Sequence, residues 1–330
     1  MKFGSGGNDL ILCTATEVTE EDINKVKEKT KEEVMQSKIF ALSANEKQQV
    51  EILLTFGHYH DSISDEDLKQ LPNLKWIQVM SSGIEQLPFQ VMRSKNVLLT
   101  SARGVHAIPI SEYVLSMILY FAKNIQHYKH LQKEKIWGYS EEVLDQMTEI
   151  SGNIIGILGA GSIGSEIAKK AKAFGMRTLG LNSNGRSVDG FDKMYPINQI
   201  GELLPQCDYI CAALPSNQET KHIIDARMIS LMKDGVVFIN VGRGDAVVEN
   251  DLIQALRTEK ITAAALDVFQ EEPLPPHHPF WGIDNLVITP HVSSCTSKYI
   301  PRTLDIFFEN YRCYKKKRFE AMINRIDFHI

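Results

Sequence analysis

The chain has 330 residues, of which 43% are hydrophobic and 23% charged, so its composition is that of a folded globular protein and excludes a disordered chain. This length exceeds what most single hydrophobic cores support and predicts two domains. The formal net charge of −5 disfavours nucleic acid or an anionic membrane surface as the main partner. We find no apolar stretch of membrane-spanning length and no signal peptide, so we expect no membrane association and a cytoplasmic location.

The first hundred residues alternate between strand and helix patterns after a Gly- and Ser-rich tail, 1–7, which is predicted to be disordered. A charged helix is predicted from about Thr19, as its N-cap, to Met35. This alternation predicts a parallel α/β sheet. Short apolar runs predict its strands at Leu10–Leu12, Glu51–Thr55, Leu74–Met80 and Val97–Thr100.

A long apolar helix is predicted after Ser101, with Pro109 in its first turn and apolar residues continuing to Ile125. These apolar residues nearly encircle the helix, so it must be covered on more than one side. A domain junction or a subunit interface would provide that cover. We expect a homodimer.

A glycine-rich turn follows the apolar run Ile154–Leu158 and leads directly into a helical pattern. This strand, G-x-G-x-x-G turn and helix form the fingerprint of dinucleotide binding. The free N–H groups and the positive dipole at the start of the helix suit a pyrophosphate. Gly159 permits the tight turn, Gly161 lets the pyrophosphate approach the backbone, and Gly164 lets the helix lie close on the strand. Two further candidate contacts of NAD or NADP stand between the glycines, namely Ser162 and Ile163.

The end of the next predicted strand, Arg177–Leu181, bears on the choice between NAD and NADP. A Rossmann site for NAD usually has an acidic residue about 20 positions after the glycines, bound to the ribose 2′-hydroxyl. Here Asn182, Ser183 and Arg186 stand in that region, and they could bind a 2′-phosphate that a carboxylate would repel. We therefore favour NADP over NAD; the alternative is a polar turn with Arg186 in water.

Four more apolar runs predict strands that are buried on both faces: Asp208–Leu214, Val236–Val241, Ile261–Leu266 and Leu286–Thr289. A helical pattern from Ser297 to about Lys316 has nothing to pack on in a finished Rossmann domain, so we expect it to return to the first domain. The predicted fold class is α/β, with two doubly wound parallel sheets. A Rossmann domain, residues 102–296, is inserted into a discontinuous flavodoxin-like substrate domain, residues 1–101 and 297–330.

Three predicted strands end in residues that suit hydride transfer, at the sheet edge where ligands bind in open α/β folds. Arg243, between two glycines, can offer its planar guanidinium to a carboxylate. His291 follows the last strand and Glu272 the one before it. A carboxylate beside a histidine stabilises the protonated imidazole, which can then act as acid or base near neutral pH.

Together with a nicotinamide, these groups are the minimum equipment for hydride transfer at C2 of a 2-hydroxy or 2-keto acid. Arg243 would bind the carboxylate and polarise the carbonyl, His291 would exchange the hydroxyl proton, and Glu272 would orient and charge His291. Each residue alone has a plain alternative: a surface arginine, a structural histidine or a loop carboxylate. Their joint placement behind a dinucleotide motif favours the catalytic interpretation.

The chain resembles the D-isomer-specific 2-hydroxyacid dehydrogenase family over essentially its full length. The matching segments, in order, are Gly159–Gly164, Leu214–Thr220, Asn240–Gly244, Leu266–Pro273 and Thr289–His291. The resemblance implies that Arg243, Glu272 and His291 are catalytic. It also implies that Asp267 hydrogen-bonds the nicotinamide carboxamide.

The same resemblance implies further ligand contacts. Leu214 and Pro215 would cover the cofactor, and Val241 would lie beside it. Backbone amides would bind the substrate carboxylate in the segment Ser81, Ser82, Gly83 and Ile84. Two alternatives stay open: a dinucleotide-dependent dimeric binding module without significant turnover, and a related amino-acid or formate dehydrogenase. The chain has five cysteines in no zinc-ligand spacing, which predicts reduced thiols and no metal site.

Overall fold

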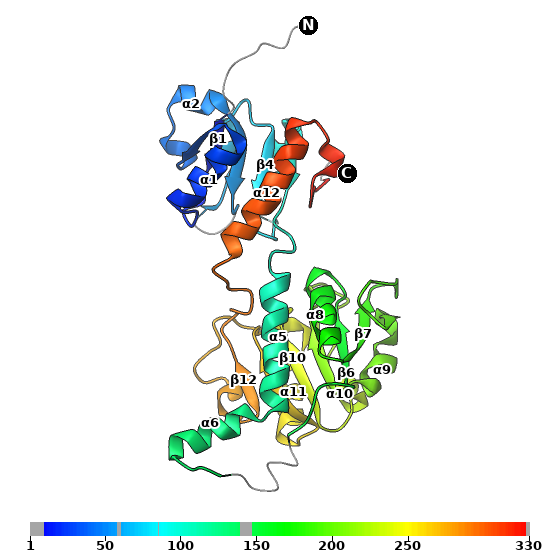
Figure 1. Cartoon of the computed structure of the whole chain (residues 1–330). Helices are drawn as coiled ribbons and strands as arrows, with labels where there is room; N and C mark the ends of the chain where they lie inside the picture. The colour runs from blue at the N-terminus through cyan, green and yellow to red at the C-terminus, as the bar shows by residue number, and fades with distance from the viewer. Residues whose placement is uncertain (1–9, 58–60, 85, 139–146, 328–330) are drawn as a thin grey trace. The chain divides into compact units, whose positions relative to one another are not determined.

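The structure is a computed structural model, and it describes residues 10–57, 61–84, 86–138 and 147–327. The predicted disordered tail, 1–7, lies outside the described residues. The chain divides into two compact units, drawn in Figure 1. The first unit comprises Met1–Val105 and Thr296–Ile330, and the second comprises His106–Cys295.

The first unit contains a parallel five-stranded sheet with strand order β2-β1-β3-β4-β5, which is the flavodoxin-like order. Its strands are β1 (Leu10–Cys13), β2 (Glu33–Gln36), β3 (Val50–Thr55), β4 (Trp76–Val79) and β5 (Leu98–Thr100). Its helices are α1 (Glu20–Thr30), α2 (Ala44–Gln49), α3 (Asp65–Lys69), α4 (Phe89–Ser94) and α12 (Tyr299–Lys315), with short 3₁₀ turns η1 (Ile39–Ala41) and η7 (Phe319–Ala321).

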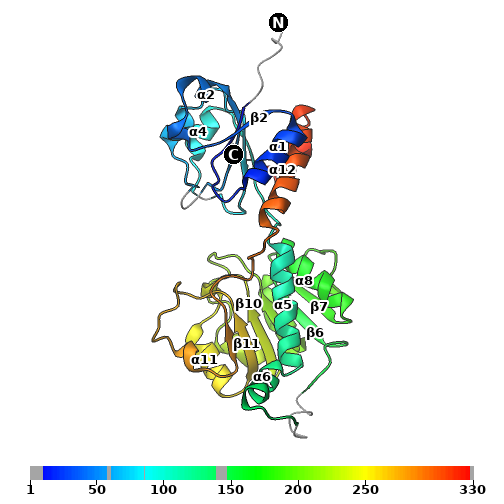
Figure 2. The same cartoon turned by 60° about the vertical axis from the view of Figure 1, so that its left-hand side comes forward.

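Helices α1 and α12 cover the same face of this sheet (Figures 1 and 2). The ring of Trp76 on β4 stacks on Phe307 of α12, with centroids 5.3 Å apart. The C-terminal helix therefore packs beside α1 on the sheet of the first hundred residues, and its apolar side joins the core on that face.

The start of α1 follows the prediction, but its end does not. Thr19 and Asp22 form a reciprocal capping box, in which the Thr19 hydroxyl accepts from Asp22 N at 3.2 Å. The prediction that this helix continues to Met35 was wrong. The helix ends at Lys31, whose φ of 62° is left-handed, and Glu33–Gln36 form the edge strand β2 beside β1. A lysine replaces the glycine that usually marks such an end, so the sequence carries no visible stop signal.

The second unit contains a parallel seven-stranded sheet with strand order β12-β11-β10-β9-β6-β7-β8, the Rossmann order extended by one strand. The predicted α/β fold class, with two parallel sheets, is thereby confirmed. The edge strand β8, of mixed polarity, was not predicted. The strands are β6 (Ile154–Leu158), β7 (Arg177–Asn182), β8 (Lys193–Pro196), β9 (Tyr209–Ala212), β10 (Val236–Asn240), β11 (Ile261–Leu266) and β12 (Leu286–Ile288).

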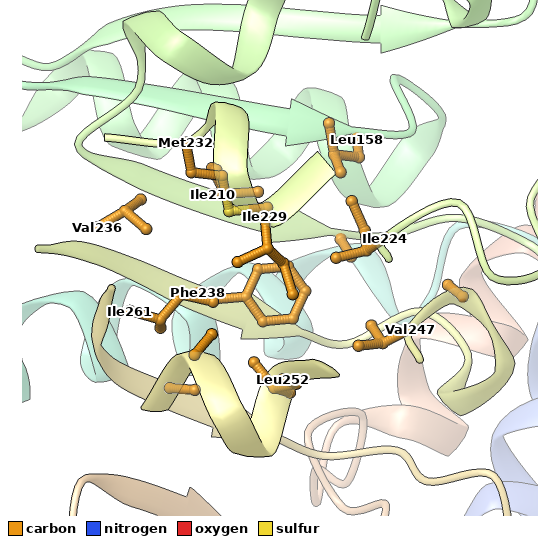
Figure 3. Close-up of a cluster of buried hydrophobic side chains, with 14 of the residues drawn as sticks. Leu158, Ile210, Ile224, Ile229, Met232, Val236, Phe238, Val247, Leu252 and Ile261 are labelled. Carbon is orange, nitrogen blue, oxygen red and sulfur yellow. The ribbon is translucent and has the colours of Figure 1, made fainter. Parts of the chain in front are cut away.

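Helices cover both faces of this sheet. On one face lie α5 (Ala107–Ala122) and α8 (Ser162–Ala173), and Figure 2 shows α5 running across the strands. On the other lie α9 (Ile200–Leu203), α10 (Ala226–Leu231) and α11 (Glu249–Arg257). Figure 3 shows Phe238 of β10 in this second core, between Ile229 of α10 and Leu252 of α11. Short 3₁₀ turns complete the unit: η3 (Ile197–Gln199), η4 (Leu204–Gln206), η5 (Gly244–Ala246) and η6 (Pro279–Gly282).

The long apolar helix is shorter than predicted. It ends at Ala122, and a separate helix, α6 (Ile125–Glu134), begins after Asn124. Asn124 has a left-handed φ of 47°, which reverses the backbone curvature and breaks the helix before Ile125.

Three further observations concern the cysteines, the helices and possible metal ligands. All five cysteines are free thiols, and burial raises the pKa of Cys13, Cys207 and Cys211 to about 12. Over the described ranges, no helix combines the length and apolar character needed to cross a membrane. The same residues contain no cluster of three or more His, Cys, Asp or Glu side chains that could hold a metal ion.

Candidate active site

The glycine turn between β6 and α8 is shaped as a dinucleotide site requires. Gly159 has a φ of 107°, and a Cβ there would lie 2.5 Å from the carbonyl oxygen of Ala213. A Cβ on Gly164 would overlap the carbonyl oxygen of Gly159. Only glycine fits these two positions, because the backbones approach too closely for a side chain.

Gly161 differs from its neighbours, since a Cβ there would meet no atom within 4 Å. It is the N-cap of α8, and no side chain caps this helix end. The free space therefore lies in front of the exposed first N–H groups of the helix, beside Ser162, which is exposed, and Ile163, which is half-buried. A pyrophosphate fits such a site, because the backbone donors and the helix dipole both favour an anion.

The end of β7 forms a compact turn around Asn182. The Asn182 side chain donates to Arg186 O at 2.9 Å and accepts from Gly185 N at 2.6 Å. Its amide group is thus engaged in the turn itself. Ser183 and Arg186 are exposed and remain available to a ligand.

The loops after β9 and β10 lie against each other at the carboxyl edge of the sheet. Leu214 is buried and Pro215 exposed, and Val241 is buried at the end of β10. A Cβ on Gly242 would lie 2.7 Å from both N and O of Leu214, so the two loops are in backbone contact.

Arg243 is exposed on a turn that is held by the side chain of Asn240. Asn240 is buried, donates to Arg243 O at 3.0 Å and accepts from Gly242 N at 3.1 Å. The guanidinium folds back, and its Nη1 donates to Gly242 O at 2.7 Å. The turn therefore presents a charged group at the strand end on a rigid backbone.

Glu272 and His291 are in direct contact. Oε2 of Glu272 lies 2.8 Å from Nδ1 of His291, and Oε1 accepts from Phe269 N at 3.0 Å. Their side chains are 36% and 46% exposed, so the pair is open to a ligand. Since Nδ1 faces the carboxylate, Nε2 is the ring nitrogen left to exchange a proton with another group.

Asp267 organises the segment that carries His291. It is fully buried at the end of β11, and its Oδ1 accepts from Thr289 Oγ1 at 2.6 Å and from Val292 N at 2.9 Å. Its Oδ2 accepts from Ser293 N at 2.9 Å. His291, between these anchors, has a left-handed φ of 55°, which is strained for a non-glycine residue. These hydrogen bonds hold the strained backbone in place.

The Asp267 network extends to α5. The hydroxyl of Tyr113 lies 2.9 Å from Thr289 Oγ1, and burial raises the pKa of Tyr113 to about 12, which keeps the hydroxyl protonated. Sequence reasoning missed Tyr113, Thr289 and Asn240. An asparagine two positions before Gly242, at the end of a strand, is a visible turn signal. Nothing in the sequence pairs Tyr113 with Thr289, which are 176 positions apart.

A pocket of about 480 Å³ adjoins the His291–Glu272 pair. Among the residues that the structure describes, its wall includes no lysine or arginine. Besides the pair, it is lined by Phe269, Pro273, Leu274, Trp281, Ile288 and Pro290.

The predicted substrate-binding segment Ser81, Ser82, Gly83 and Ile84 belongs to the first unit. It follows β4 at the carboxyl edge of that sheet, and Ser81 Oγ donates to Gly83 O at 2.8 Å. Ser82 is exposed, whereas Ile84 packs against the core. The segment is therefore a short, internally bonded turn.

Comparison with known proteins places this site in a family. Residues 115–293 match the profile described as "D-isomer specific 2-hydroxyacid dehydrogenase, NAD binding domain". A glyoxylate reductase of Aeropyrum pernix is 32% identical over 240 residues, which is 72% of each chain. A glyoxylate/hydroxypyruvate reductase A of Arabidopsis thaliana is 32% identical over 231 residues, covering 69% of this chain and 71% of that protein.

A solved structure is similar over nearly the whole chain. It is a D-isomer specific 2-hydroxyacid dehydrogenase family protein from Aeromonas salmonicida, with a TM-score of 0.77 and 29% identity, covering 98% of this chain and 100% of that one. The sequence match spans the glycine turn and the loops of Arg243, Glu272 and His291, and the structural match spans both units. The chain belongs to the D-isomer specific 2-hydroxyacid dehydrogenase family.

Proposed function

We propose that this protein is an NAD(P)-dependent D-2-hydroxyacid dehydrogenase that transfers hydride between the nicotinamide and C2 of a small 2-keto or D-2-hydroxy acid. The observation that carries the proposal is the 2.8 Å contact between Glu272 and His291 at the carboxyl edge of a Rossmann sheet. Relatives named glyoxylate and hydroxypyruvate reductases support a small 2-keto acid as substrate.

The proposed roles follow from the geometry of the three strand-end loops. A bound reduced nicotinamide would supply the hydride. His291, protonated and oriented by Glu272, gives the Nε2 proton to the forming alkoxide, and takes it back in the oxidative direction. Arg243 exchanges its hydrogen bond to Gly242 O for the substrate carboxylate and carbonyl, and stabilises the charge that develops on the carbonyl oxygen.

The cofactor contacts are proposed on the same basis. Gly161 and Ser162 at the start of α8 would bind the pyrophosphate, and Leu214, Pro215 and Val241 would lie along the cofactor. We favour NADP over NAD because the turn after β7 offers Ser183 and Arg186 and no carboxylate in the Asn182 position.

Two roles proposed from the resemblance involve backbone and buried groups. The amides of the Ser81–Ile84 turn would bind the substrate carboxylate. Asp267 would accept a hydrogen bond from the nicotinamide carboxamide. Protein groups already use three of the roughly four acceptor positions of its carboxylate, which leaves about one for the cofactor.

We also propose that the protein is a homodimer. Helix α6 has no buried residue, and Ile125 at its start is 41% exposed. Ile136 and Trp137, just beyond its end, are 56% and 103% exposed. Large apolar side chains that are exposed at the start of a surface helix and just beyond its end are typical of an interface. Sedimentation at several concentrations tests this assignment, and the Trp137→Ser variant should weaken association.

One assay tests the proposed function against its alternatives. Glyoxylate, hydroxypyruvate and pyruvate are each added to the protein with NADH or with NADPH, and loss of reduced-nicotinamide absorbance is followed. Turnover supports the dehydrogenase. Cofactor binding without turnover supports a dinucleotide-dependent binding module. In a parallel assay with NAD or NADP, activity restricted to an amino acid or formate supports a related dehydrogenase.

A further inference from the structure

A second histidine–glutamate pair lies in the loop that carries Glu272. Nε2 of His278 is 3.3 Å from Oε2 of Glu249, the first residue of α11, and the two side chains are only 18% and 19% exposed. The proposed reaction uses neither residue. A charged or strongly polar pair this well covered needs a reason, because desolvating it costs free energy.

The pair ties the loop to α11 at two points. Oε1 of Glu249 accepts from Gln270 N at 3.1 Å, while Oε2 faces His278. Glu272 lies between these two tied positions in the chain. The carboxylate of Glu249 therefore contacts the loop on both sides of Glu272, the proposed catalytic glutamate.

Other contacts bind the same loop to the segment that follows Arg243. The side chain of Gln270 donates to Val247 O at 2.9 Å. A Cβ on Gly244 would overlap the backbone of Phe269, so the two backbones touch at this point. The loops of Arg243 and Glu272 are therefore one packed unit, and Glu249 stands at its outer edge.

Both ring nitrogens of His278 are engaged. Nδ1 accepts from Phe280 N at 3.3 Å, so the neutral ring carries its proton on Nε2, which faces Oε2 of Glu249 at 3.3 Å. The ring also packs on Phe280, with centroids 4.7 Å apart, and Phe280 is buried in the core. His278 thereby links the loop to the core as well as to α11.

We propose that Glu249 and His278 are positioning residues for the reaction: they hold the 270–278 loop so that Glu272 reaches Phe269 N and His291 Nδ1 at once. The proposal rests on the proposed function, since it gives these two residues a role through Glu272. Loosening the loop weakens the Glu272–His291 contact, whereas Arg243 keeps the hydrogen bonds of its own turn with Asn240 and Gly242.

The test compares two variants of one residue. In His278→Asn, the amide oxygen can still accept from Phe280 N, but the side chain is too short to reach Glu249. In His278→Gln, the longer amide can still donate to Glu249. We expect His278→Asn and Glu249→Ala to lower kcat about tenfold, within the range of a small misplacement of catalytic groups, with KM and cofactor Kd unchanged within twofold.

Two further results are expected. His278→Gln should restore most of kcat. The double variant should be no slower than either single variant, because the two residues act as one unit. As a control, Lys233→Met removes the 2.7 Å ion pair with Asp208 at the opposite edge of the sheet and should change no kinetic constant.

Unchanged kcat in His278→Asn and Glu249→Ala would overturn the proposal, as would a loss of kcat that His278→Gln does not restore. Failure of the proposed function is a separate outcome, recognised when the wild type turns over no 2-keto acid. In that case amide hydrogen exchange at Phe269 tests the loop-holding role, because Phe269 N–H donates to Glu272 Oε1. Faster exchange at Phe269 in the variants supports the loop-holding role, and unchanged exchange refutes it.

Discussion

Oε2 of Glu272 lies 2.8 Å from Nδ1 of His291, although the two residues follow different strands and are 19 positions apart. The contact depends on the backbone of both loops. Phe269 N donates to the other oxygen of Glu272, and His291 has a φ of 55° between hydrogen bonds to Asp267. A strained residue of this kind costs about 1–3 kcal/mol and persists where the surroundings enforce it.

Replacing Glu272 tests the pair directly. We expect Glu272→Gln to lower kcat about a hundredfold, in the range of general acid–base contributions. The neutral amide keeps the length of the side chain but removes the charge beside the His291 ring. Glu271→Gln, next to it on the exposed loop, is the matched control. A kcat of Glu272→Gln equal to that of the wild type contradicts the pairing.

His291→Ala removes the proposed proton donor. Turnover should fall by roughly 10²–10⁴-fold, whereas the Kd of the reduced cofactor should stay within twofold. His277→Ala, an exposed histidine on the neighbouring loop, should behave as the wild type. Steady-state rates and cofactor fluorescence titration measure the two quantities. Retained turnover in His291→Ala would assign the proton transfer to another group.

The glycine turn offers a comparison between two glycines of one motif. A Cβ on Gly161 meets no atom within 4 Å, so Gly161→Ala should fold with an unchanged Tm but bind the cofactor at least about tenfold more weakly, because the methyl group occupies the pyrophosphate space. A Cβ on Gly164 overlaps Gly159 O, so Gly164→Ala should lower Tm. Thermal unfolding and cofactor titration distinguish the two effects. Equal cofactor affinity in Gly161→Ala and wild type would place the pyrophosphate elsewhere.

Asn182→Asp tests the proposed preference for NADP. The aspartate keeps the acceptor for Gly185 N but loses the donor to Arg186 O, and it adds a negative charge. Repulsion of the 2′-phosphate should raise the Kd of NADPH at least about tenfold, with little change for NADH. If both cofactors lose affinity equally, the side chain acts only by holding the turn.

Asp267→Asn tests what holds the His291 segment. An amide offers one acceptor oxygen where the carboxylate offers two, so either Val292 N or Ser293 N loses its partner. An unsatisfied buried N–H costs about 1–3 kcal/mol, and we expect a loss of that size in the free energy of unfolding, together with reduced kcat. Tyr113→Phe removes only the outer hydrogen bond to Thr289 and should cost about 0.5–1.5 kcal/mol. Denaturant unfolding measures the free energy of unfolding of both variants.

Much of this molecule could be predicted because its signals are local. Apolar runs mark the strands that are buried on both faces, and the spacing of Gly159, Gly161 and Gly164 marks a strand, turn and helix. The sequence signals predicted the wrong element where the local preference of a segment differs from what its tertiary contacts favour. Residues 33–36 form a strand only because β1 offers them a partner, and the helix before them ends at a lysine.

The sequence by itself determined the fold class, the dinucleotide motif and which ionisable side chains stand at the strand ends, because each depends on residue type and short-range spacing. The tertiary structure alone decided that Glu272 meets His291, that Asp267 and Tyr113 hold the His291 segment, and that Glu249 pairs with His278. These contacts join residues from separate loops. Their distances depend on how parallel strands and the helices over them pack in space, and no local pattern in the chain encodes that.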